Sequence, residues 1–336
     1  RYFGIPENEY LFVGARRFPL AIHHLDDMSQ MKGGTTKSRP PTSPSPGSLP
    51  HHLIVAASKL AKHRVDVLAS VNMQYSKSQI DLAFDLSRHV GTPGRSVLIF
   101  VSGIAHITEL VEKFQEIRQR GGRRNNYVVV PIHSDIPFED QMTAFDPATR
   151  REGDDDDDDN TPPIKIVVAT NSAESSITLP DCDHVICLGT AKRVEYNPKF
   201  HRIQLVHRFV SKAGCNQRAG RTGRVRPGTV WRLYTKQLNE SMDEFDPPEI
   251  QQTPLENVIL SLKSSLQCPV VPVLENVISP PDLSHLSPAF SELHRMRYIE
   301  SSSDEATLTE DGTLAAALGL DLKTTQVVLF GIRVGI

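Results

Sequence analysis

The stretch SVLIFVSGIAHITELVEKFQEIRQR, residues 96–120, decides the fold class of this chain. It begins with an almost continuous apolar run, 96–102, which is typical of a β-strand buried on both faces. Apolar residues then recur at helical spacing, which predicts a helix over 104–120. The alternation continues with a strand at 126–134, a short helix at 138–145, and strands at 164–170 and 183–189. This order predicts an α/β fold, with a parallel sheet that carries helices on both faces.

Polar residues follow several of these strands at their carboxyl ends. Ser102 follows the first strand, His133 and Ser134 follow the second, and Thr170 and Asn171 follow the third. In open α/β sheets, ligands gather at the carboxyl ends of the strands. We therefore expect functional side chains among these residues.

The pattern changes after a last predicted strand at 228–235. Apolar residues recur at helical spacing over 253–266 and 288–299, and residues 306–320 indicate a turn or strand that leads into another helix. The 336 residues are enough for two domains of ordinary size. We expect a small, mostly helical domain after the sheet.

Charge is unevenly distributed along the chain. The net charge is only −3, yet no Asp or Glu occurs between Lys199 and Lys236. The basic residues inside this block are Arg202, Arg208, Lys212, Arg218, Arg221, Arg224, Arg226 and Arg232. A solvated basic face normally has acidic residues interspersed, so the block predicts a surface for phosphate or nucleic acid.

Several classes of site and segment are disfavoured. The four cysteines lack CxxC spacing, which indicates reduced thiols of an intracellular protein, nuclear or cytoplasmic, and no metal site. No apolar run approaches the length of a transmembrane helix, so we expect no membrane partner. The first residues resemble neither a signal peptide nor a translation start, and we expect the chain to belong to a longer protein.

Two segments, 29–50 and 151–163, are predicted to be disordered insertions. The first is rich in Ser, Thr, Pro and Gly, and the second contains six consecutive aspartates. Contiguous like charges repel one another, so the aspartate run favours a solvated loop over a cation site.

The stretch NQRAGRTGRVRPG, residues 216–228, places Arg218, Arg221 and Arg224 three residues apart. A short helix starting near Asn216 would bring these arginines towards one edge, and the glycines between them permit a close approach of backbone or ligand. Guanidinium groups bind phosphate oxygens in a bidentate manner. The spacing alone fits two interpretations equally well: arginine fingers for a transferring phosphoryl group, or a general RNA-backbone patch.

This stretch and three others resemble motifs of the DEAH/RHA-type ATP-dependent RNA helicases of superfamily 2. QRAGRTGR (217–224) resembles motif VI, ATNSAESSITLPD (169–181) motif V, and IFVSGIAHI (99–107) motif IV. IHSDIPFEDQMTAFDP (132–147) is similar to the segment after motif IV. The matches come in the family's order, and motifs V and VI together are highly specific.

The resemblance extends to both ends and implies a domain organisation. Residues 1–14 would be the end of a first RecA-like domain (RecA1), and 15–245 the second (RecA2). Residues 246–312 would form a winged-helix domain, and 313–336 the beginning of a helical ratchet domain.

The resemblance also implies roles for single residues. Gln217, Arg221 and Arg224 would face the γ-phosphate as the catalytic set, and Phe145 would stack on the adenine of ATP. The residues implied to contact RNA are Ser102, Thr170, Asn171 and Lys212. Arg218 would instead support the structure or the RNA, and a hairpin at about 192–210 would guide nucleic-acid strands.

ATP and Mg²⁺ are the implied cofactors. No GxxxxGK[ST] loop is present, since GGTTKS (33–38) has Thr36 where the second glycine belongs and no strand before it. DEFD (243–246) lacks the preceding strand of a metal-holding acidic motif. The nucleotide cradle and the metal ligands are therefore expected mainly in RecA1, which becomes a partner of this chain together with single-stranded RNA and possible protein cofactors.

Two positions depart from the family pattern. Cys187 stands where the family usually has Asp, and Asp181 gives LPD, closer to RHA-like members than to the splicing ones. The implied function is an ATP-dependent RNA helicase whose isolated fragment is inactive alone. The alternatives are an ATPase-silent RNA-binding or scaffold protein on the same fold, and a DNA helicase of the same superfamily.

Overall fold

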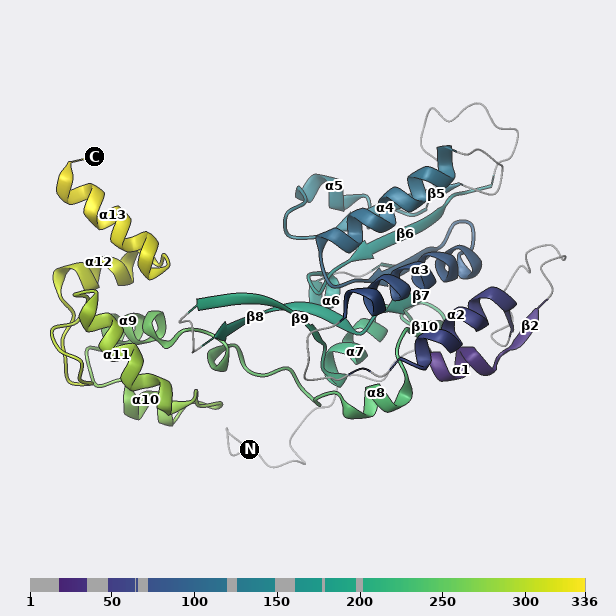
Figure 1. Cartoon of the computed structure of the whole chain (residues 1–336). Coiled ribbons are helices and arrows are strands. Elements are labelled where there is room, and N and C mark those ends of the chain that lie inside the picture. Colours follow the sequence, from purple (N-terminus) through teal and green to yellow (C-terminus); the bar gives the residue numbers. More distant parts are fainter. Residues whose placement is uncertain are drawn as a thin grey trace. The chain divides into compact units, whose positions relative to one another are not determined.

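The computed structural model describes residues 18–34, 48–63, 65, 72–119, 126–148, 161–176, 179–197 and 202–335. These residues form two compact units (Figure 1). The sheet unit comprises the described residues within 12–193 and 206–246, and the helical unit those within 194–205 and 247–336. The segment predicted to end RecA1, 1–14, lies outside the described residues.

The sheet unit is built on a six-stranded sheet in which all neighbouring strands are parallel. In spatial order the strands are β1 (Leu20–His24), β10 (Gly228–Arg232), β7 (Cys182–Cys187), β4 (Ser96–Phe100), β6 (Ile164–Ala169) and β5 (Tyr127–Ile132). Every residue of β4 is buried, as expected for an apolar run in the middle of such a sheet. The predicted α/β fold with a RecA-like parallel sheet is confirmed.

Helices connect and cover these strands. They are α1 (Leu25–Gln30), α2 (His51–Ala61), α3 (Met73–Val90), α4 (Ile104–Gln119), α5 (Phe138–Met142), α6 (Ala173–Ser176), α7 (Lys212–Ala219) and α8 (Lys236–Ser241). Helix α4 buries Ile107, Leu110 and Phe114, which recur at helical spacing, and it packs against β5 and β6. Gln79 of α3 is buried, and its Nε2 donates to the carbonyls of Leu188 and Leu233, at 2.9 and 2.7 Å. This amide fixes α3 to the residues just beyond β7 and β10.

The segment 29–50 corrects one prediction. Its two ends are ordered, because α1 runs to Gln30 and the short strands β2 (Lys32–Gly34) and β3 (Ser48–Pro50) pair in parallel. Residues 35–47 and 151–160 of the predicted insertions lie outside the described residues. The prediction missed the ordered ends because composition marks the middle of a polar segment better than its boundaries.

The predicted hairpin near 192–210 is present. Strands β8 (Thr190–Asn197) and β9 (Arg202–Phe209) form a two-stranded sheet of their own. Val194 and Leu205 expose much of their surface, 51% and 61%. The hairpin therefore presents apolar as well as basic side chains to solvent.

Apart from its hairpin residues, the helical unit is small and almost entirely helical, as predicted. Its elements are η2 (Glu249–Gln251), α9 (Leu255–Leu266), α10 (Val271–Glu275), η3 (Leu283–His285), α11 (Leu286–Arg295), α12 (Glu310–Leu318) and α13 (Leu322–Val334). Ile259, Leu293 and Tyr298 lie at its core. Helix α12 approaches Tyr298 so closely that a Cβ on Gly312 would lie 1.9 Å from the Tyr298 carbonyl oxygen, so this position requires glycine.

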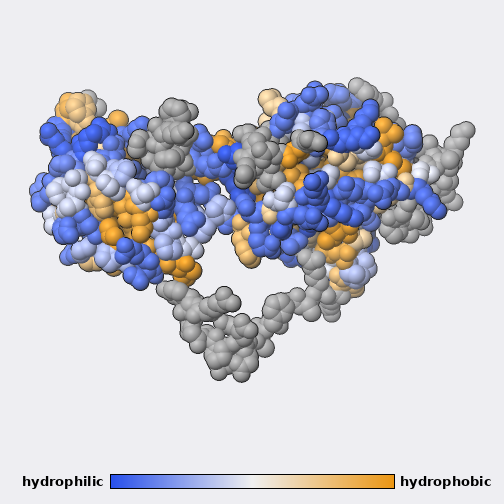
Figure 2. Space-filling view, turned by 60° about the horizontal axis from the view of Figure 1, so that its bottom comes forward, coloured by the Kyte–Doolittle hydropathy of each residue, from blue (hydrophilic) through white to orange (hydrophobic). Residues whose placement is uncertain are grey.

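The surface is mostly hydrophilic, with hydrophobic patches in both units (Figure 2). The large exposed apolar side chains include Phe138 of the sheet unit and Val327 and Phe330 of α13. Within the described residues, no single helix is long and apolar enough to cross a membrane.

Candidate functional site

The strands of the sheet end in register along one edge. Phe100 of β4 pairs with Ala169 of β6 and with Cys187 of β7. Ile132 of β5 pairs with Ala169, and Arg232 of β10 pairs with Cys187. The residues that follow these strands therefore share the carboxyl edge of the sheet, where the sequence predicts polar functional side chains.

Ser102 and Thr170 both lie at this edge, but their side chains are buried. Each is only 3% exposed, and each hydroxyl already has a close partner. The Thr170 Oγ1 lies 3.0 Å from the Ser172 hydroxyl, and the Ser102 Oγ lies 2.8 Å from Nδ1 of His106. Asn171, directly after Thr170, is exposed. Of these three predicted residues, Asn171 presents its side chain most openly.

His106 contacts the predicted residue Ser102 and was not among the residues predicted from the sequence. Its Nδ1 faces Ser102, and its Nε2 lies 3.2 Å from the Ser76 hydroxyl of α3. Burial lowers the pKa of His106, while Glu109 opposes and Lys192 adds to this effect. The neutral ring has one donor and one acceptor nitrogen, so it fixes the direction of both hydroxyl bonds. The spacing from Ser102 to His106, one helical turn, was the available signal.

Helix α7 runs alongside β7 from one edge of the sheet to the other. At the carboxyl edge, the Val210 N–H donates to the Gly189 carbonyl, just beyond β7. At the amino edge, the Thr222 hydroxyl donates to the carbonyl of Cys182, the first residue of β7, at 2.7 Å. The helix begins at Lys212 and not near Asn216 as predicted, because Ser211 caps it by accepting from the Gly214 N–H.

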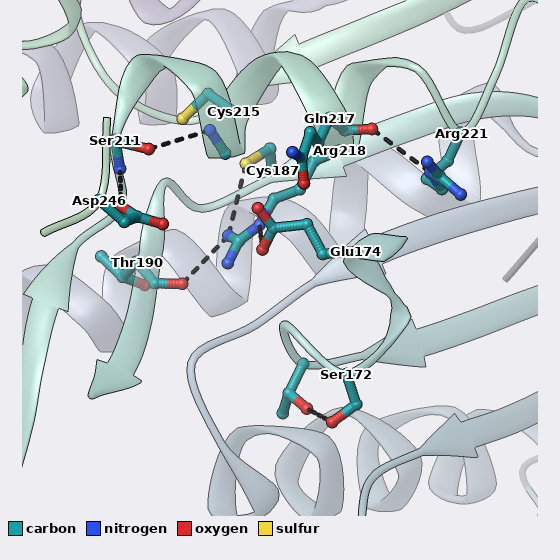
Figure 3. A network of polar contacts seen from close by, with 12 residues as sticks. Ser172, Glu174, Cys187, Thr190, Ser211, Cys215, Gln217, Arg218, Arg221 and Asp246 are labelled. Atoms are coloured by element: carbon teal, nitrogen blue, oxygen red, sulfur yellow. Dashed lines mark hydrogen bonds and ion pairs between the residues drawn. The ribbon is translucent and has the colours of Figure 1, made fainter. Parts of the chain in front are cut away.

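Asp243, Glu244 and Asp246 contact the first turn of α7. Figure 3 shows Asp246 next to Ser211. The Ser211 N–H donates to the Asp246 carboxylate at 3.0 Å, and the Lys212 N–H donates to the Asp243 carbonyl at 2.8 Å. The Lys212 ammonium lies 3.5 Å from the Glu244 carboxylate. The structure therefore places Lys212 at the carboxyl edge, but with both its charge and its backbone N–H engaged.

Arg221 and Arg224 lie beyond the end of α7, at the amino edge of the sheet. The segment between them is fixed by the buried Thr222 and by Gly223, whose φ of 77° favours glycine. Their Nε groups donate to the carbonyls of Gln217 and Gly220, at 3.4 and 3.2 Å. Burial lowers the pKa of Arg221, and the neighbouring Arg224 charge lowers it further. Arg221 and Arg224 thus place two like charges close enough to affect each other.

Phe145, like Arg221 and Arg224, lies towards the amino edge of the sheet. It is half-buried in a turn after α5, where the Ala144 and Phe145 N–H groups donate to the Gln141 and Met142 carbonyls, at 3.0 and 2.9 Å. The carbonyls on either side of Phe145 are held by Lys165, near the start of β6. The predicted residues thus form two groups. At the carboxyl edge lie Ser102, Thr170, Asn171 and Lys212, and towards the amino edge lie Arg221, Arg224 and Phe145. Gln217 lies between the two groups, on the exposed side of α7.

Comparison with known proteins connects this geometry to a family. Residues 83–226 match the family model described as the helicase conserved C-terminal domain. The chain is 35% identical over 272 residues to the ATP-dependent RNA helicase dhx29 of Xenopus laevis, covering 78% of this chain and 19% of that protein. It is 31% identical over 240 residues to the DExH-box ATP-dependent RNA helicase DExH1 of Arabidopsis thaliana, covering 71% of this chain and 22% of that protein. The Escherichia coli DEAH/RHA helicase HrpB has the same fold, with a TM-score of 0.64 at 22% identity, over 93% of this chain and 31% of that one.

The chain belongs to the DEAH/RHA-type helicases of superfamily 2. It spans about a fifth of the length of the curated relatives that it matches. Both the stretch 217–224, predicted to be motif VI, and the stretch 169–181, predicted to be motif V, lie within the residues that match the family model.

Within helicase motif VI, Arg218 differs from the other two arginines. It is fully buried, and its Nη1 donates to the Thr190 carbonyl at 3.1 Å (Figure 3). Its Nε lies 3.4 Å from the Glu174 carboxylate of α6, and its guanidinium lies over the Phe100 ring at 5.1 Å. Arg218 therefore joins α7 to α6 and to the end of the central strands, in agreement with the predicted structural role.

Cys187 is the other partner of Arg218. The Arg218 Nη1 lies 3.8 Å from the Cys187 sulfur. A hydrogen bond with Cys215 lowers the pKa of the Cys187 thiol, and the Arg218 charge lowers it further, against the effect of burial. The Cys187 sulfur thus accepts from the buried Arg218 guanidinium at the position where the family resemblance leads us to expect an Asp.

Proposed function

We propose that this chain supplies one half of an ATP-driven RNA motor, in which Arg221 and Arg224 complete an ATP site shared with RecA1. The observation that carries the proposal is the pair of adjacent guanidiniums on a segment held rigidly by Thr222 and Gly223. A γ-phosphate next to these arginines would offset their mutual repulsion. Positive charge placed in advance of the reaction stabilises the charge that develops during phosphoryl transfer.

Different residues of this chain would contact the phosphate and the base of the nucleotide. Gln217, Arg221 and Arg224 would contact the γ-phosphate, and Phe145 would stack on the adenine base. ATP supplies the transferable phosphoryl group when bound, and Mg²⁺ would be held mainly by RecA1. Within the described residues, no group of three or more His, Cys, Asp and Glu side chains could hold a metal ion.

The carboxyl edge would bind single-stranded RNA through its phosphates and sugars. Asn171 is exposed and would contact RNA directly, whereas Lys212 would exchange its Glu244 partner for a phosphate. Ser102 and Thr170 are buried, and they would lie directly below the surface that the RNA backbone contacts. Such contacts carry no sequence information, which suits a motor that steps along any strand.

We propose the domain organisation that the family resemblance implies: RecA2 over 15–245, a winged helix over 246–312, and the start of a ratchet domain over 313–336. Supporting this, the compact units separate after residue 246, and the helical unit follows it. The protein would act inside the cell, where its RNA substrate is found, and protein cofactors would control it.

RNA-stimulated ATP hydrolysis by the longer protein tests the proposal. Single-stranded RNA should stimulate turnover, single-stranded DNA of the same sequence should do so much less, and this chain alone should show none. Equal stimulation by DNA would favour a DNA helicase. Absence of turnover with or without RNA would favour an ATPase-silent scaffold, and turnover by the isolated chain would contradict the shared site.

A further inference from the structure

Lys165 is a buried cation inside the sheet unit. It lies near the start of β6 in the apolar run IKIVVA, and only 1% of its surface is exposed. Burying an ammonium group is costly unless each of its protons has a partner. The position of Lys165 therefore requires oxygen atoms around its Nζ.

Three oxygen atoms surround this Nζ. It donates to the Ala144 carbonyl at 2.9 Å and to the Asp146 carbonyl at 2.6 Å. The third oxygen belongs to the Asp181 carboxylate, which forms an ion pair with it at 3.0 Å. The two carbonyls stand immediately before and after Phe145 in the chain. Lys165 thus holds the backbone of the turn that presents Phe145.

Asp181 continues this set of contacts towards the arginine segment. Its carboxylate is almost buried, and its own carbonyl accepts from the Ser96 N–H of β4 at 3.0 Å. The next residue, Cys182, accepts from the Thr222 hydroxyl between Arg221 and Arg224. The Phe145 turn is therefore joined to motif VI by the Lys165 hydrogen bonds, the Lys165–Asp181 ion pair, the chain from Asp181 to Cys182 and the Thr222 hydrogen bond.

We propose that Lys165 is a positioning residue for the nucleotide: it holds Phe145 where the adenine base must meet it, in fixed relation to Arg221 and Arg224. This inference rests on the proposed adenine-stacking role of Phe145. Its chemical logic is that a half-buried aromatic ring stacks well only if its backbone is rigid, because ordering a mobile turn on binding weakens affinity.

Lys263 of the helical unit provides a matched control. It is also buried, and its Nζ donates to two carbonyls of one loop, those of Asp304 at 2.6 Å and Ala306 at 2.8 Å. No predicted ligand residue lies on that loop. Lys263→Met therefore removes a buried ammonium group and its two carbonyl hydrogen bonds from a loop that has no proposed nucleotide role.

Hydrogen exchange in this chain tests whether Lys165 holds the turn. Lys165→Met should accelerate exchange of the Ala144 and Phe145 amides at least tenfold, within 138–148, and leave β4 and β7 protected. Lys263→Met should accelerate exchange around 300–309 and leave 138–148 unchanged. Unchanged exchange at Ala144 and Phe145 in Lys165→Met would overturn the proposal.

Steady-state ATP hydrolysis by the longer protein tests the positioning role. Stacking of one base contributes about 1–3 kcal/mol, so Phe145→Ala should raise KM for ATP by roughly 5- to 150-fold. Lys165→Met should raise KM in the same direction with kcat within about threefold, and it should reduce the preference for ATP over CTP. The double variant Lys165→Met/Phe145→Ala should have the same KM for ATP as Phe145→Ala alone. A KM raised by the product of the two single effects would contradict the proposal.

The two experiments separate this proposal from the one on which it rests. If Phe145→Ala leaves KM unchanged, the stacking role is wrong and the nucleotide role of Lys165 fails with it, while the exchange result still decides whether Lys165 holds the turn. If Lys165→Met does not fold, Asp181→Asn takes its place. This variant keeps both carbonyl bonds and removes the ion pair, and it should shift exchange and KM in the same direction by a smaller factor.

Discussion

The Thr222 hydroxyl donates to the Cys182 carbonyl oxygen at 2.7 Å. Thr222 lies between Arg221 and Arg224, and Cys182 is the first residue of β7. The bond therefore fixes the arginine segment to the amino end of a central strand. It explains how arginines beyond the end of a helix can keep a defined position.

Replacing Thr222 by valine should destabilise the sheet unit by about 1–2 kcal/mol, because a buried carbonyl loses its donor at nearly constant volume. Urea unfolding followed by the fluorescence of Trp231 measures this, since it is the one tryptophan of the chain and is buried in β10. Thr108→Val, on the exposed face of α4, should cost less than about 0.5 kcal/mol. Equal effects of the two changes would mean that the Thr222 bond has no special role.

Gly223→Ala should destabilise the sheet unit more than backbone strain alone predicts. The position has a φ of 77°, and an added Cβ would lie 2.4 Å from Cδ2 of Leu20. We expect a loss of at least about 2 kcal/mol in unfolding free energy. Gly319→Ala is the matched comparison, with a φ of 62° and no atom within 4 Å of the added Cβ, and it should cost about 1 kcal/mol. A smaller loss at Gly223 than at Gly319 would contradict the close approach.

Arg218→Met should be among the most destabilising single changes in the sheet unit. It leaves Glu174 half-buried without its cation and removes the donor of the Thr190 carbonyl. Breaking one partner of a buried charged pair costs about 3–5 kcal/mol. Urea midpoints measure the effect, and Arg88→Met on the surface of α3 should change them little. A loss below about 1 kcal/mol would show that Arg218 has no structural role.

Acid should destabilise the sheet unit through His184 of β7. Burial lowers the pKa of His184 to about 4, while the unfolded chain keeps the usual value near 6.5. Between these values the unfolded state binds a proton that the native state excludes, so stability falls as the pH drops from about 6.5 to 4. Unfolding free energies measured from pH 7.5 to 5 should show this slope. His184→Gln should reduce it, whereas His51→Gln at an exposed position should not; an unchanged slope in His184→Gln would assign the acid sensitivity elsewhere.

Five of the six strands of the sheet were predicted, because each contains a short apolar run, as β4 does. The edge strand β1 (Leu20–His24) was not predicted, since LAIHH is short and ends in two histidines. The ends of the predicted strands also placed Ser102, Thr170 and Asn171 correctly at the carboxyl edge. The burial of two of them was not predictable, because it depends on packing: the Ser102 hydroxyl lies against His106, a helical turn further along, and the Thr170 hydroxyl lies against Ser172.

Two other features needed the three-dimensional structure. The start of α7 at Lys212 depends on a cap by Ser211 and on cover from Asp243 and Asp246, far along the chain. Lys165 looks in sequence like a chance charge in an apolar run, and its role becomes visible only when the Ala144 and Asp146 carbonyls meet its ammonium. Contacts between distant segments leave no periodic signal in the sequence.

The central claim is that Arg221 and Arg224 act on the phosphoryl group of ATP, and the rate of RNA-stimulated ATP hydrolysis by the longer protein tests it most directly. Arg221→Ala and Arg224→Ala should each lower kcat roughly 10³-fold. Arg226→Ala, in the same basic stretch but paired with Asp183 at 3.4 Å, should change kcat by less than about fivefold. Near-normal kcat in Arg221→Ala or Arg224→Ala, with RNA binding intact, would contradict the account.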